Sequence, residues 1–178
     1  MPINIPNFLT VARFCLVPLI IVMIVQGRWT IAFAVFLIAG VTDAIDGFLA
    51  RRLDQRTEIG AYLDPLADKA LLISIYITLS ITGVLAPWLA ILVVSRDVMI
   101  IGAVVLSWIV GDPVEIAPLR VSKANTAAQI LFAGLLLGAS AFGLDVSALK
   151  AACEVVVGLL TLFSLAAYLA LWMRHMAE

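Results

Sequence analysis

Four aspartates within a strongly apolar sequence are the residues best suited to chemistry. Asp43 and Asp46 are three residues apart, and Asp64 and Asp68 are four residues apart. At about 3.6 residues per turn, either spacing places both carboxylates on one face of an α-helix. A carboxylate at membrane depth costs on the order of 2.5–3.5 kcal/mol. Because basic residues are few in this stretch, we expect a bound cation to offset that cost.

The residue types favour a hard divalent ion, Mg²⁺ or Mn²⁺, because all the ligands would be oxygen atoms. Two such ions that share carboxylates could hold a diphosphate. Small residues beside the acids, Gly47, Ala50 and Gly60, leave room for a bulky ligand such as a nucleotide, and Arg51 could meet a phosphate. Two alternatives stay open: small residues also favour close helix packing, and intramembrane acids can form structural ion pairs or a proton relay.

The elements that position these residues are expected to be membrane helices. Of 178 residues, 64% are hydrophobic and 13% charged, against about a quarter charged in soluble domains. A helix of about 20 residues crosses a bilayer and satisfies its own backbone there. We therefore predict an all-α polytopic membrane protein, a six-transmembrane-helix bundle that forms one domain over residues 1–178. The predicted spans are roughly 7–26, 29–52, 58–82, 87–109, 121–143 and 148–173.

The basic residues predict the orientation of these spans. With both termini in the cytoplasm, only Arg28 and Lys150 lie on the opposite side. Six basic residues then lie on the cytoplasmic side: Arg51, Arg52, Arg56, Arg120, Lys123 and Arg174. The second and third spans, joined by a short loop, should be antiparallel neighbours that bring the aspartates together near that side. No signal or transit pattern is recognised, so we expect a bacterial inner (cytoplasmic) membrane. We expect no nucleic-acid partner, because no basic stripe with interleaved aromatic residues is found.

The aspartates belong to a longer motif. From Asp43 to Asp68 the sequence reads DAIDGFLAR, then eight further residues, then GAYLDPLAD. This stretch resembles the signature of the CDP-alcohol phosphotransferases, D-x2-D-G-x2-A-R-x8-G-x3-D-x3-D, at all eight fixed positions. The chain length and the six-span plan are also similar to that family. The resemblance implies a homodimeric enzyme of phospholipid synthesis that moves a phosphatidyl group from CDP-diacylglycerol to an alcohol and releases CMP.

The resemblance also implies roles for the motif residues. Asp43, Asp46 and Asp64 would be metal ligands in a two-metal site. Asp68 would be the general base that takes the proton of the acceptor hydroxyl, and would also lie close to or contact the second metal. The residues that line the CDP-lipid site would be Asp43, Gly47, Ala50, Arg51 and Gly60.

The acceptor alcohol is predicted from segments outside the motif. The stretch 4–13 is similar to both the cardiolipin synthases and the phosphatidylglycerophosphate synthases of the family. The runs 95–100 and 121–129 are more similar to the CMP-forming cardiolipin synthases, because Asp97 and Asn125 stand where the other group tends to carry a glutamate and a lysine-rich run. We therefore expect phosphatidylglycerol as acceptor, with glycerol 3-phosphate as the alternative. Candidate ligands of the acceptor phosphate are Arg13, Arg96 and Lys123.

Two further functions are alternatives. An intramembrane prenyltransferase also binds a diphosphate through acids and Mg²⁺, but it generally has more spans and lacks the continuation through Gly47, Ala50 and Arg51. If the protein were a small cation or proton transporter, acidic residues would be expected along a route open to both sides of the membrane. Here the four acids gather near one end of two predicted helices, which favours a one-sided catalytic site.

Overall fold

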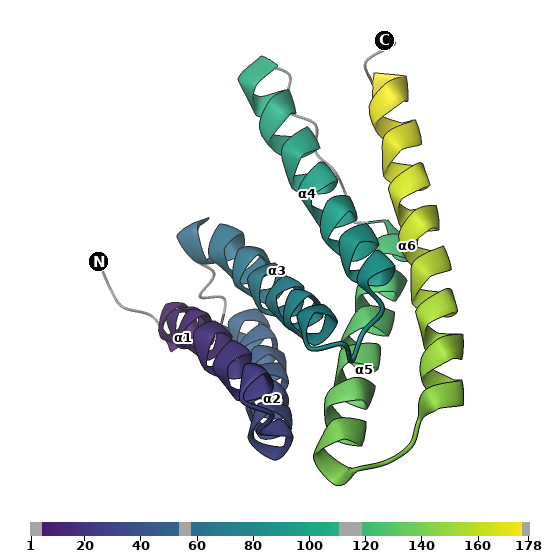
Figure 1. Ribbon diagram of the computed structural model, residues 1–178. Helices are drawn as coiled ribbons and strands as arrows, with labels where there is room; N and C mark the ends of the chain where they lie inside the picture. The colour runs from purple at the N-terminus through teal and green to yellow at the C-terminus, as the bar shows by residue number, and fades with distance from the viewer. Residues whose placement is uncertain (1–4, 54–57, 111–118, 176–178) are drawn as a thin grey trace. The chain divides into compact units, whose positions relative to one another are not determined.

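The computed structural model describes residues 5–53, 58–110 and 119–175, and it describes side chains over 15–43, 69–103 and 119–173. Within these residues it has six α-helices and no strand (Figure 1). They are α1 (Ile5–Val25), α2 (Trp29–Leu53), α3 (Glu58–Ile81), α4 (Pro87–Val110), α5 (Arg120–Phe142) and α6 (Ser147–His175). The predicted all-α class is confirmed, and every helix begins and ends within two residues of its predicted span. The assignment of the whole chain to one domain stays a prediction.

The helices present an apolar surface that suits lipid. Among the described residues, two segments are long and apolar enough to cross a bilayer, Arg120–Phe142 and Ser147–Met173. Shorter apolar helical segments are Cys15–Val25, Trp29–Asp43 and Lys69–Ile81. Large apolar side chains such as Ile81 and Leu131 are 78% and 74% exposed. Extensive exposed apolar surface is unfavourable for a protein in water, so hydrocarbon is the natural solvent of these faces.

Glycines in the left-handed region follow three of the helices, α1, α3 and α5, and the ends of α3 and α5 show their role. Gly83 has φ 77°, and the N–H of Val84 donates to the carbonyl of Leu79 over 2.9 Å. At the end of α5, Gly143 has φ 63°, and the N–H of Leu144 donates to Ala139 over 2.9 Å. This six-to-one bond satisfies a carbonyl that the helix leaves unpaired, and only glycine adopts the required φ without steric cost. Short turns follow, so the next helix starts close by in sequence.

The chain divides into two compact units. The first contains α1, α2, α3 and the part of α5 from Ala133 onward. In this unit α1 packs against both α2 and α3 (Figure 1). Its fully or almost fully buried apolar side chains come from all three helices: Ile20, Ile24, Ala32, Ala39, Ile75, Tyr76 and Leu79. These contacts hold the parts of α2 and α3 that lead to the aspartates.

Two glycines of α5 allow close packing on α2 within the same unit. A Cβ atom added to Gly134 would lie 3.1 Å from the Phe36 ring, and one added to Gly138 would lie 3.3 Å from the Phe33 ring. The rings of Phe33 and Phe142 also meet edge to face, with centroids 6.0 Å apart. Small residues at helix contacts are the usual means of association in a bilayer, where dispersion contacts replace the hydrophobic effect.

The second unit contains α4, α5 up to Phe132, and α6. Here α4 packs against α6. The two helices pack closely at Gly158, where an added Cβ would lie 2.9 Å from the Trp88 ring. At the start of α4, the N–H of Ala86 donates to the Glu154 carboxylate over 3.2 Å. An acidic partner at a helix N-terminus compensates unpaired N–H groups and the helix dipole.

Candidate active site

The four motif aspartates lie on two helices of the first unit. Asp43 and Asp46 are in the C-terminal half of α2, and Asp64 and Asp68 are in the N-terminal half of α3. Both pairs are therefore helical, so the predicted one-face spacing holds for each pair. Asp43 is exposed. The other three side chains lie outside the described part of the structure, and the meeting of all four carboxylates stays a prediction.

The residues just before Asp43 on α2 are described by the structure. The hydroxyl of Thr42 lies 2.8 Å from the carbonyl of Ile38 and 2.9 Å from that of Ala39, so it is used by the backbone of its own helix. One turn before Asp43, a Cβ added to Gly40 would meet no described atom within 4 Å. The sequence places a second carboxylate, Asp46, three residues later on the same helix, and oxygen donors at this spacing suit Mg²⁺ or Mn²⁺.

Most of the other predicted site residues can be placed only on their helices. Arg13 is in α1, the residues Gly47, Ala50 and Arg51 are in α2, and Gly60 is in α3. Their side chains lie outside the described part. Among the described residues, no three His, Cys, Asp or Glu side chains come together. The metal centre and the CDP-lipid site thus stay predictions that rest on the motif.

A polar cluster in the second unit centres on Arg96 of α4. Arg96 is 1% exposed, although its side chain is charged. Its Nη1 donates to the Asp97 carboxylate at 2.5 Å, so these neighbours form a buried ion pair. Its Nη2 donates to Ser122 on α5 at 2.5 Å and to Ser164 on α6 at 2.7 Å, and its Nε donates to Ser164 at 3.2 Å. One guanidinium group therefore ties three helices together.

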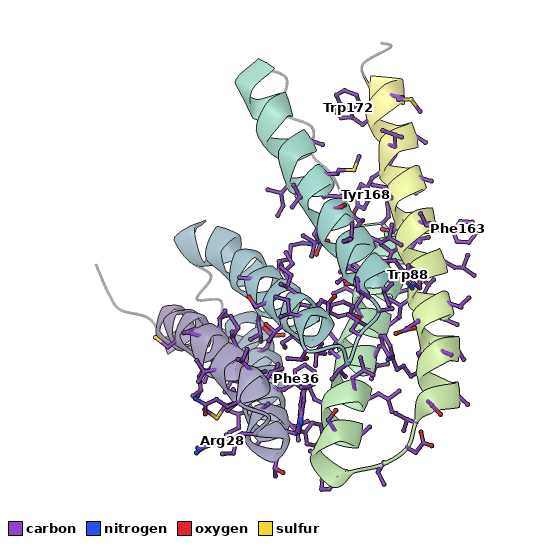
Figure 2. The ribbon with its side chains drawn as sticks, in the orientation of Figure 1. Arg28, Phe36, Trp88, Phe163, Tyr168 and Trp172 are labelled. Atoms are coloured by element: carbon purple, nitrogen blue, oxygen red, sulfur yellow. The ribbon has the colours of Figure 1, made fainter. Side chains whose placement is uncertain are left out.

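An aromatic ring covers the same guanidinium. The Cζ atom of Arg96 lies 5.7 Å from the centroid of the Tyr168 ring, which is within the range of a cation–π contact. Figure 2 shows Tyr168 on the side of α6 toward α4, whereas Phe163 points away from α4 and is 64% exposed. The polar face of α6 is thus turned inward, and its apolar face is left for lipid.

A second group of hydrogen bonds continues between α5 and α6. The Thr161 hydroxyl lies 3.0 Å from Oδ1 of Asn125 and 2.7 Å from the carbonyl of Val157, and Nε2 of Gln129 donates to it at 3.4 Å. The Nδ2 atom of Asn125 is buried without a hydrogen-bond partner among the described residues. Buried polar groups are normally paired. This unpaired donor is a weak point of an otherwise satisfied cluster.

Most of this cluster was not predicted as part of a site, although its spacing is visible in the sequence. Three polar residues of α5 and three of α6 recur at intervals of three and four, which is one face of each helix. They are Ser122, Asn125 and Gln129, and Thr161, Ser164 and Tyr168. Such residues inside apolar spans predict helix–helix hydrogen bonds.

Two of the three candidate ligands of the acceptor phosphate, Arg96 and Lys123, differ in how far their side chains are exposed. Arg96 is buried among protein partners, whereas Lys123, in the first turn of α5, is exposed. The N–H of Lys123 donates to the carbonyl of Leu119 at 3.1 Å, so the residue is held in the helical backbone from its start. Neither fact assigns a ligand, but a lysine of this kind can reach a soluble or interfacial anion directly.

The chain is similar in sequence to known proteins. A sequence profile of the family described as CDP-alcohol phosphatidyltransferase matches residues 3–173. A probable CMP-forming cardiolipin synthase of Drosophila melanogaster is 40% identical over 152 residues, which cover 76% of this chain and 47% of that protein. The human CMP-forming cardiolipin synthase is 36% identical over 157 residues, 79% of this chain and 52% of that protein. The chain thus spans about half the length of these two relatives.

A bacterial relative is matched along nearly its whole length. The CDP-diacylglycerol–glycerol-3-phosphate 3-phosphatidyltransferase of Haemophilus influenzae is 33% identical over 177 residues, 95% of this chain and 93% of that protein. The family match and the apolar helices together identify a multi-pass integral membrane protein. Because the family profile covers almost the entire sequence, including the complete eight-position motif, the chain belongs to the CDP-alcohol phosphatidyltransferase family.

Proposed function

We propose that this protein transfers the phosphatidyl group of CDP-diacylglycerol to the free hydroxyl of phosphatidylglycerol, which yields cardiolipin and CMP. The observation that carries the proposal is the complete motif on α2 and α3 in a chain that matches the family over residues 3–173. The similarity to CMP-forming cardiolipin synthases of fly and human supports phosphatidylglycerol as the acceptor.

The aspartates bind and activate the reactants in this proposal. Asp43, Asp46, Asp64 and Asp68 would hold Mg²⁺ or Mn²⁺, which supplies positive charge against the diphosphate. Asp68 takes the proton from the acceptor hydroxyl. The hydroxyl oxygen then forms a bond to the lipid-side phosphorus, and the bond from that phosphorus to the oxygen of CMP breaks. CMP leaves with the electron pair, so atoms and charge balance.

Other residues position the two substrates. We propose that small residues beside the aspartates, Gly47, Ala50 and Gly60, admit the cytidine nucleotide and that Arg51 meets its diphosphate. Lys123 and Arg13 meet the phosphate of the acceptor, since both phosphatidylglycerol and glycerol 3-phosphate carry one. The positive-inside distribution supports a cytoplasmic active site with both termini on that side. A bacterial inner membrane and a homodimer are part of the same proposal.

A second acceptor is supported by a specific observation. The Haemophilus relative, whose name specifies glycerol 3-phosphate, is matched over 93% of its length. Glycerol 3-phosphate is therefore the alternative acceptor, and phosphatidylglycerophosphate the alternative product. The same aspartates and the same leaving group serve both reactions.

A comparison of acceptors tests the choice. Purified protein in mixed micelles receives CDP-diacylglycerol and Mn²⁺ with either phosphatidylglycerol or glycerol 3-phosphate, and the lipid products are separated and identified by mass. Cardiolipin formed only in the first reaction supports the proposal. Phosphatidylglycerophosphate formed only in the second would keep the mechanism and replace the acceptor. A protein that releases no CMP with either compound would refute both choices.

A further inference from the structure

The buried guanidinium of Arg96 has little capacity left for a substrate. An arginine side chain offers five N–H donors. Four described hydrogen bonds use Nε, one donor of Nη1 and both donors of Nη2, toward Asp97, Ser122 and Ser164. One Nη1 donor is left, and it belongs to a side chain that is 1% exposed, so a phosphate has no open approach to it. Charge-assisted bonds of this kind are among the strong ones in proteins, so the arrangement favours an internal role.

The bond from Arg96 to α5 ends next to an exposed cation. Ser122 accepts from Nη2 at 2.5 Å, and Lys123 is the next residue of the helix. Successive helical residues point about 100° apart, so fixing Ser122 against Arg96 also fixes the direction in which Lys123 leaves α5. Ser122 is half-buried and Lys123 is exposed, which agrees with these two directions.

We propose that Arg96 is a positioning residue for the acceptor: through Ser122 it sets the rotation of the first turns of α5 and thereby places Lys123 against the acceptor phosphate. This inference rests on the proposed function, because it takes Lys123 as the cation that meets that phosphate. Arg96 itself does not contact the acceptor. Asp97, Ser164 and Tyr168 hold the guanidinium in place from α4 and α6.

The positioning role and a direct contact predict different kinetics. If Arg96 acts through Lys123, the Ser122→Ala change matters only while Lys123 is present. If Arg96 and Lys123 each bind the phosphate, or act separately, the fold increases in acceptor KM caused by Ser122→Ala and Lys123→Gln multiply in the double variant. A double-mutant cycle on the acceptor KM measures this coupling. The cycle uses Ser122→Ala, Lys123→Gln and the double variant of the full chain.

The measurement is steady-state turnover with phosphatidylglycerol varied and CDP-diacylglycerol saturating. We expect Ser122→Ala to raise the acceptor KM about three- to tenfold, as for the loss of one hydrogen bond, with kcat and the KM for CDP-diacylglycerol within about twofold of the wild type. Lys123→Gln should raise the acceptor KM at least as much. The double variant should match Lys123→Gln. Ser122→Thr is the matched control. Threonine keeps the hydroxyl, so the acceptor KM should stay at the wild-type value.

Several outcomes would overturn the inference. A double variant whose KM increase equals the product of the two single increases shows independent action. An unchanged acceptor KM in Ser122→Ala, or a loss confined to kcat, also contradicts positioning. Arg96→Lys provides a second variant. Lysine keeps the positive charge but lacks the planar guanidinium that donates to several partners at once, so the variant should behave as Ser122→Ala does. The proposed function fails separately, if the wild-type protein releases no CMP with phosphatidylglycerol.

Discussion

Replacing Asp97 with asparagine should destabilise the second unit by removing the counter-charge of a buried arginine. The side chains of Arg96 and Asp97 are 1% and 2% exposed, so water cannot compensate the loss. Breaking a buried ion pair costs about 3–5 kcal/mol. Arg96 keeps its bonds to Ser122 and Ser164, and asparagine retains a carbonyl acceptor. We therefore expect the lower end, about 3 kcal/mol, for Asp97→Asn.

The matching variant Arg96→Met removes the counter-charge of the buried Asp97 carboxylate instead. It should lower the free energy of unfolding by about 3–5 kcal/mol. The double variant Arg96→Met/Asp97→Asn has neither buried charge, but it loses the hydrogen bonds to the two serines and the cation–π contact with Tyr168. Hydrogen bonds between membrane helices average about 0.6 kcal/mol each and a cation–π contact contributes about 0.5 kcal/mol or more, so the double variant should lose about 2 kcal/mol. It should thus be more stable than either single variant.

Equilibrium unfolding in mixed micelles with increasing dodecyl sulfate measures these free energies. The chain has four tryptophans as fluorescent probes, and Asn125→Ala gives a reference change that carries no charge. A double variant whose loss equals the sum of the two single losses would refute the reasoning. It would mean that Arg96 and Asp97 do not depend on each other for their stability in the buried cluster.

Further variants test the helix contacts and the metal site. Gly158→Leu should cost about 1–3 kcal/mol in the same unfolding assay, as overpacking does, whereas Gly158→Ala should be nearly neutral because the partly exposed Trp88 ring can move and alanine favours the helix. Thr161→Val should cost about 0.6–1.7 kcal/mol through its interhelical bonds; no loss at all would count against the described hydrogen bonds. Asp43→Asn should shift the Mn²⁺ activation curve to higher concentration, and an unchanged curve would contradict its role as a ligand. Asp68→Asn should abolish turnover but keep metal-dependent binding of CDP-diacylglycerol, measured as thermal stabilisation; full turnover would exclude it as the base.

Much of the fold follows from the sequence because the bilayer restricts the choices. Uninterrupted apolar stretches of about 20 residues must be helices in lipid. The breaks between them are chemically distinct: Gly83 and Gly143 end helices in the left-handed region, and Pro87 begins α4. These signals are local, and so the helix bounds could be predicted to within two residues.

The motif was also predictable from the sequence, because it requires eight residue types at fixed spacing in two neighbouring helices. The Arg96 cluster was harder to predict. Arg96 interrupts an apolar run, which suggested a ligand for a substrate phosphate. Its partners Ser122 and Ser164 are 26 and 68 residues away in sequence. Periodic polar positions show that a helix has a polar face, but they do not say which other helix meets it. That information comes only from the packing of α4, α5 and α6 within the second unit.

Product formation by the purified wild-type protein and by Asp68→Asn tests the central claim most directly. Both proteins receive CDP-diacylglycerol and phosphatidylglycerol, with either Mn²⁺ or excess EDTA, and CMP and cardiolipin are measured together. Equal amounts of CMP and cardiolipin, formed only by the wild type and only with the metal, are the predicted result. Equal turnover in EDTA, or undiminished turnover by Asp68→Asn, would contradict phosphatidyl transfer at a metal–aspartate site.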